Sequence, residues 1–161
     1  MNINLSKLNY SFLKKPLLIG GKAMEYYGIR KAGEDIDFIA DEKDIVALIK
    51  QYPDRIKNLS GDLSVCPFEF EFWRTVCFYD YNYLKEGAIE KEDYLIISLE
   101  KLLFTKALAM KEPKYLEDTK LIVADIIKIQ EKRYTEIESR NKELLQKITG
   151  ITYIEKTEPV K

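Results

Sequence analysis

Apolar positions in the first part of the chain alternate between strand-like runs and helix-like stripes. Residues 15–20 form a short apolar run, which predicts a buried strand. Residues 21–29 carry apolar side chains at helical intervals, and Gly28 is suited to the end of that helix. After a polar loop, residues 35–40 alternate in polarity and predict a second strand, and Asp41 is suited to cap the helix that follows. This order of elements is typical of an α/β protein.

Two of the predicted strands separate acidic from apolar side chains. In "DIDFIA" the alternation places the apolar residues on one face and both Asp35 and Asp37 on the other. The later stretch "PFEFEFW" repeats this character, because its phenylalanines alternate with Glu69 and Glu71. Each strand therefore presents a pair of carboxylates on one side.

The period of the pattern changes at Ser98. A last short strand, "DYLIIS", is followed by three predicted helices at residues 98–112, 113–133 and 135–150, with Ser98 as the first N-cap. We therefore expect a mixed-sheet α/β (α+β) core at residues 1–97, a C-terminal helical region at residues 98–150, and a flexible tail at residues 151–161.

Composition narrows the classes of function. The chain has 161 residues, 46% of them hydrophobic and 33% charged, with a formal net charge of −1, which is ordinary for a globular protein and offers no general field for nucleic acid. It contains no histidine and two cysteines, which argues against a structural zinc site and against nucleophilic schemes that need histidine. No signal peptide or membrane-spanning run is evident, so a cytoplasmic protein without a membrane partner is expected.

The paired carboxylates suggest a metal site. Asp35 and Asp37 would repel one another unless a cation lay between them, and their hard oxygen atoms suit Mg²⁺ or Mn²⁺. A third acid from the neighbouring strand would complete the ligands, and Glu71 is preferred over Glu69 because it lies deeper in its strand. A bare Asp-x-Asp pair is also compatible with a solvated strand edge.

The glycine pair suggests a site for phosphate. A strand that ends at Gly20 and Gly21 and leads directly into a helix lets backbone N–H groups approach an anion closely. Lys22 and Arg30 lie where they can add positive charge. Glycine pairs of this kind also occur in simple turns.

Together these residues resemble a known family. "IGG", thirteen residues and "DID" are similar to the signature of the DNA polymerase β-type nucleotidyltransferase superfamily, in particular its small bacterial and phage-borne members of abortive-infection or toxin–antitoxin systems. The resemblance implies Mg²⁺-dependent transfer of a nucleoside monophosphate from an NTP such as ATP to a hydroxyl group. The acceptor would be tRNA, a protein or a small molecule, and a cognate toxin or antitoxin partner would be expected. Asp35, Asp37 and Glu71 would be the catalytic metal ligands.

The resemblance extends into the helical region. "SLEKLLFTKALA" is similar to a helix in which a lysine, here Lys106, faces the nucleotide. "EPKYLEDTKLI" is similar to a second motif and carries over Lys114 and Asp118, which would otherwise form a surface pair four residues apart. Gly21 stands where many relatives have serine, so a second hypothesis stays open: a non-catalytic module of this fold that acts as an antitoxin, inhibitor or regulatory partner.

Overall fold

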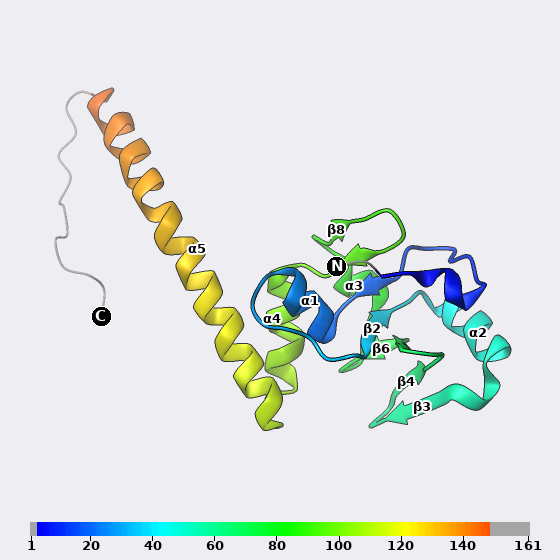
Figure 1. Cartoon of the computed structure of the whole chain (residues 1–161). Coiled ribbons are helices and arrows are strands. Elements are labelled where there is room, and N and C mark those ends of the chain that lie inside the picture. The colour runs from blue at the N-terminus through cyan, green and yellow to red at the C-terminus, as the bar shows by residue number, and fades with distance from the viewer. Residues whose placement is uncertain (1–2, 149–161) are drawn as a thin grey trace. The chain divides into compact units, whose positions relative to one another are not determined.

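The computed structural model describes residues 3–148, so the predicted tail at residues 151–161 lies outside it. The helical elements are η1 (Leu5–Leu8), α1 (Gly20–Tyr26), α2 (Glu42–Gln51), η2 (Pro53–Arg55), α3 (Tyr81–Leu84), α4 (Leu99–Leu108) and α5 (Pro113–Gln146). The strands are β1 (Leu17–Leu18), β2 (Ile36–Ile39), β3 (Ile56–Leu59), β4 (Asp62–Val65), β5 (Phe70–Trp73), β6 (Thr75–Val76), β7 (Tyr79–Asp80), β8 (Ile89–Glu90) and β9 (Leu95–Ile96). Figure 1 shows their arrangement.

The central feature is a mixed seven-stranded sheet in the order β3-β4-β5-β2-β1-β9-β8. β2 runs parallel to β5, and β1 runs parallel to β9, whereas the other neighbouring pairs are antiparallel. β6 and β7 form a separate two-stranded hairpin. The predicted mixed α/β architecture with a helical C-terminal part is confirmed at this level.

One face of β2 and β5 carries the aromatic core. The rings of Phe38 and Phe72 stack with centroids 5.3 Å apart, and Phe70 lies 6.3 Å from Phe38. All three side chains are buried. Because neighbouring residues of a strand point to opposite faces, the acidic residues between these phenylalanines point to the other side of the sheet.

Several local predictions are confirmed. Asp41 caps α2 by accepting a hydrogen bond from the Lys43 N–H, and Ser98 caps α4 by accepting one from the Lys101 N–H. Gly28 directly follows Tyr27, the C-cap residue of α1. Its φ of +72° is a left-handed conformation that suits glycine. The first strand is shorter than predicted, because the chain turns at Gly20 to begin α1.

The prediction of three C-terminal helices is wrong. The expected second and third helices are one continuous helix, α5, because no glycine or proline interrupts the chain between Pro113 and Gln146. The chain divides into two compact units, Met1–Val123 and Ala124–Lys161, so α5 belongs to the first unit in its first turns and to the second unit thereafter. The change to purely helical structure nevertheless falls at Ser98, as the pattern indicated.

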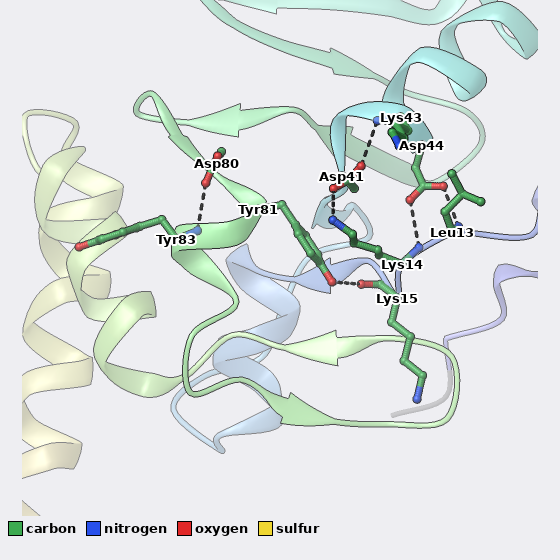
Figure 2. A network of polar contacts seen from close by, with 9 residues as sticks. All are labelled: Leu13, Lys14, Lys15, Asp41, Lys43, Asp44, Asp80, Tyr81 and Tyr83. Atoms are coloured by element: carbon green, nitrogen blue, oxygen red, sulfur yellow. Dashed lines mark hydrogen bonds and ion pairs between the residues drawn. The ribbon is translucent and has the colours of Figure 1, made fainter.

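Asp44 fastens the segment that precedes β1. Its fully buried carboxylate accepts hydrogen bonds from the Leu13 N–H at 2.8 Å and the Lys14 N–H at 3.2 Å (Figure 2). It accepts a third from the Tyr10 hydroxyl at 2.7 Å. Lys14 also pairs with the Asp41 carboxylate at 2.6 Å. The start of α2 therefore positions the chain that leads into the site strands.

No helix within residues 3–148 is both long enough and apolar enough to cross a lipid bilayer.

Candidate functional site

Adjacent parallel strands bring Asp37 and Glu71 side by side. The two residues are register partners in β2 and β5, so their side chains leave the same face of the sheet from strands about 4.8 Å apart. Asp35 lies one residue ahead of β2 and is exposed, but its charge still acts on Asp37. The negative charges of Asp35 and Glu71 therefore both act on Asp37, which is the inner carboxylate of the three.

The surroundings of Asp37 favour its protonated form. Burial raises the pKa of this carboxyl above its ordinary value, and the charges of Glu71 and Asp35 raise it further. A hydrogen bond from the Trp73 indole N–H, at 3.4 Å, and the charge of Lys106 oppose that rise without cancelling it. An ionised Asp37 thus carries negative charge that the protein itself does not fully compensate.

Glu71 has a cationic neighbour that the sequence pattern had not singled out. Lys57 places its ammonium group 3.0 Å from Glu71 Oε1 and 5.3 Å from the centre of the Trp73 ring. The alternation of "IKNL" and "FEFW" puts the side chains of Lys57, Glu71 and Trp73 on one face of the sheet. The sequence could predict this contact only if β3, β4 and β5 were already known to be neighbours. Glu69, the alternative third acid, precedes β5 and pairs with Lys7 at 2.5 Å.

The turn between β1 and α1 faces the acids. Gly20 has a φ of +64°, and a Cβ atom placed on it would lie 2.3 Å from Asp37 Oδ2. Ile19 at the N-cap of α1 offers no capping side chain, which leaves the first N–H groups of the helix without a side-chain acceptor. Lys22, expected to point toward a phosphate, pairs instead with Glu25 at 3.2 Å.

A buried carboxylate joins two of the predicted cationic residues. Asp118 accepts hydrogen bonds from Arg30 Nε at 2.6 Å and Arg30 Nη2 at 3.0 Å, and it pairs with Lys106 Nζ at 2.8 Å. Burial would raise the pKa of Asp118, but the hydrogen bonds from Arg30 and Lys106 outweigh it and hold that pKa below its ordinary value. Asp118 is therefore not the surface partner of Lys114 that a spacing of four residues suggests.

Lys106 and Arg30 respond differently to this pairing. Burial lowers the pKa of Lys106 despite the hydrogen bond to Asp118, whereas that partner raises the pKa of Arg30. Lys106 Nζ also lies 4.7 Å from the centre of the Tyr115 ring. The network holds both cations in place by joining the loop after α1 to the consecutive helices α4 and α5.

A cavity of about 210 Å³ connects these groups. Five of the six residues that the sequence predicted for nucleotide binding line it, Gly20, Gly21, Arg30, Lys106 and Lys114, and so does Asp37, which was predicted as a metal ligand. Its other wall is largely apolar and comprises Ile19, Leu59, Trp73, Val76, Cys77, Ala109 and Tyr115. Asp35, Glu71 and Lys22 lie outside this lining, so the predicted set is brought together only in part.

The apolar wall includes a strained turn that the sequence pattern did not reveal. Cys77 and Phe78 connect β6 to β7 with φ values of 51° and 67°, a region that non-glycine residues rarely occupy. The Asp62 carboxylate stabilises this turn by accepting hydrogen bonds from the Cys77 N–H at 2.7 Å and the Phe78 N–H at 3.2 Å. Asp62 thus lines the cavity, but its carboxylate already accepts hydrogen bonds from the hairpin.

The acidic side chains have the oxygen atoms that a hard divalent cation binds, but they are not arranged around a common point. Asp37 and Glu71 supply oxygen ligands, and the raised pKa of Asp37 marks negative charge that a cation would offset. Across residues 3–148, however, no three acidic or cysteine side chains are already gathered as a metal-binding group. A metal would need Glu71 to turn away from Lys57 and Asp35 to turn inward.

Comparisons with known proteins add no assignment: no protein-family description matches the chain, and neither a curated protein nor a solved structure matches it significantly. The sequence motifs and the geometry of the site are therefore the basis for a functional proposal.

Proposed function

We propose that this protein is a metal-dependent nucleotidyltransferase that moves a nucleoside monophosphate from an NTP to a hydroxyl group. The observation that carries the proposal is the position of Asp37, which lies beside Glu71 on a parallel strand and against the backbone of Gly20. This relationship links the "DID" and "GG" motifs, whose spacing resembles that of the polymerase β-type nucleotidyltransferases. The mixed sheet with flanking helices is compatible with that fold.

Each part of the site has a role in this proposal. Asp37 and Glu71, with Asp35, would hold Mg²⁺ or Mn²⁺, which when bound stabilises charge on the phosphates and orients the attacking oxygen. The N–H groups at Gly20 and Gly21 would contact the phosphates, and Lys106 and Arg30 would offset their charge. The apolar wall around Tyr115 would exclude water from the nucleoside.

Calorimetric titration with each NTP in the presence of Mg²⁺ tests the proposal. The wild-type chain should bind at least one NTP, and the double variant Asp35→Asn with Asp37→Asn should lose this binding. A matched control replaces two exposed acids on the loop between β8 and β9, Glu92→Gln with Asp93→Asn, and should bind as the wild type does. Equal binding by the site variant and the wild type would remove Asp37 from the nucleotide site.

A non-catalytic binding module of the same fold is the second candidate. It is favoured by the ion pairs within the site, because these side chains already have partners in the protein. Glu71 is paired with Lys57, and both Arg30 and Lys106 are paired with Asp118. Incubation of cell extract with each of the four α-labelled NTPs separates the two functions. An enzyme should transfer label to a tRNA, a protein or a small molecule in a manner that depends on Asp37, whereas a binding module should transfer none.

A further inference from the structure

The second part of α5 carries large apolar side chains that no described residue of its own compact unit covers. Every residue from Ala124 to Ile148 is exposed or half-buried. The exposed fractions of Ile127, Tyr134, Ile137 and Leu144 are 48%, 68%, 54% and 56%. Isolated helices in water are marginally stable unless an apolar face packs against something, so this face indicates a missing partner.

The apolar positions follow the repeat of a coiled coil. Residues 127, 130, 134, 137, 141 and 144 are separated alternately by three and four positions, which makes 127, 134 and 141 a positions and 130, 137 and 144 d positions of a heptad. Ile127, Tyr134, Ile137 and Leu144 occupy four of these six places. The stripe extends for about 26 Å along the helix at 1.5 Å per residue.

The two polar members of the stripe also have an interpretation. Gln130 occupies a d position and Asn141 occupies an a position. A buried Asn at an a position lowers the stability of a coiled coil but fixes its register and favours two parallel strands, where two copies of that residue meet. The stripe is therefore more specific than a general hydrophobic surface.

The flanking charges distinguish between the two orientations of a pair. Glu131 and Glu138 occupy e positions, and Arg133 and Arg140 occupy g positions. In a parallel, in-register pair a g residue faces the e residue of the next heptad in the other chain, so Arg133 of each copy faces Glu138 of the other. In an antiparallel pair g faces g and e faces e, which would place like charges together.

We propose that residues 124–148 of two copies of this chain associate as a parallel, in-register, two-stranded coiled coil. The charge pattern selects a second copy over an unrelated helix, because the chain is complementary to itself in this orientation. Glu138 already pairs with Lys142 at 2.9 Å within its own helix, but that pair is exposed and weak, so it does not prevent the contact. The proposal does not depend on the proposed enzymatic activity.

Sedimentation equilibrium of the full chain over a range of concentrations tests the association. We expect a reversible dimer whose dissociation constant rises about tenfold or more in Ile137→Glu, because a charge would then be buried in the seam. Ile129→Glu is the matched control: Ile129 is 40% exposed on the same helix but occupies a c position outside the seam. A chain that stays monomeric, or a dimer that both variants weaken equally, would overturn the proposal.

Charge exchange tests the orientation. Arg133→Glu and Glu138→Arg should each weaken the dimer, and the double variant should recover affinity, because the pair between chains is restored with its signs reversed. If Arg133→Glu alone strengthens the dimer, the strands are antiparallel and the proposed alignment is wrong. Asn141→Cys should form a disulfide between chains under mild oxidation, whereas Glu143→Cys, at a c position, should not. Absence of the Asn141→Cys cross-link in a dimeric protein would equally contradict the in-register arrangement.

Discussion

The α-carbon of Gly20 lies so close to the carboxylate of Asp37 that any β-carbon at this position would come within 2.3 Å of Oδ2. Gly20 also has a φ of +64°, which disfavours other residues for a second reason. The first glycine of the pair thus does more than turn the chain. It leaves the room in which the inner acid of the site lies.

Replacement of Gly20 by alanine should therefore destabilise the protein and displace Asp37. We expect a loss of about 2–3 kcal/mol in the free energy of unfolding, from the left-handed backbone and the steric overlap together. Gly28→Ala is the control, since Gly28 has a φ of +72° but open space around it, and it should lose only about 1 kcal/mol. Urea denaturation of both variants measures the difference, and equal losses would show that the contact with Asp37 carries no strain.

Asp37→Asn should stabilise the protein near neutral pH. Because the folded-state pKa of Asp37 is raised, ionisation destabilises the fold as the pH rises from the ordinary value of about 4 through the folded value. The variant should be more stable than the wild type at pH 7, and the difference should vanish below pH ~4, where the wild-type carboxyl is protonated. Denaturation at both pH values checks this, and a gain independent of pH would contradict it.

Added Mg²⁺ should raise the melting temperature of the wild type but not that of Asp37→Asn. Binding to the folded state alone stabilises it by about 2.7 kcal/mol when the metal is at a hundredfold excess over its dissociation constant. Thermal denaturation with Mg²⁺, with Mn²⁺ and with NaCl of matched ionic strength separates binding from screening. The same shift in wild type and variant would place the metal elsewhere.

Loss of the Asp118 carboxylate should be among the most damaging changes in the first compact unit. Asp118→Asn leaves Lys106 buried without its counter-charge, and we expect a loss of about 3 kcal/mol. Because the pKa of Asp118 is lowered, this contribution should persist at pH 5 and 7 and disappear only as the pH falls below about 4 through the folded value. Glu117→Gln, which alters an exposed pair with Lys120, should change stability by less than about 0.5 kcal/mol. Chemical denaturation should rank the two variants in this order.

Asp44→Ala should release the segment ahead of β1. Three donors would lose the buried carboxylate that accepts their hydrogen bonds, so we expect a loss of about 3 kcal/mol. Tyr10→Phe removes one of these bonds and should lose about 1 kcal/mol. Hydrogen exchange should locate the effect of Asp44→Ala at the Leu13 and Lys14 amides, and unchanged protection there would contradict the assigned role.

Local signals in the sequence were sufficient for many elements but not for the whole site. The caps at Asp41 and Ser98 depend only on residues within one turn, and both are confirmed. The sequence pattern does not predict the hairpin of β6 and β7, because its left-handed turn is formed by Cys77 and Phe78 and contains no glycine. The residue that stabilises this turn, Asp62, lies on another strand. The pattern predicted separate helices at residues 113–133 and 135–150, but the structure has one continuous helix, α5, because no helix breaker lies between them.

The sequence by itself determined which residues share a strand face or a helix end, because those relationships follow from backbone periods of 2 and 3.6 residues. It therefore placed Asp37 and Glu71 each on the acidic side of its own strand, and Gly20 at a turn into a helix. Only the tertiary structure decided that β2 and β5 are parallel neighbours, that Lys57 reaches Glu71, and that Asp118 joins Arg30 to Lys106. Those contacts link residues far apart in the chain, and their register is set by how the whole sheet and its helices pack, which no local pattern contains.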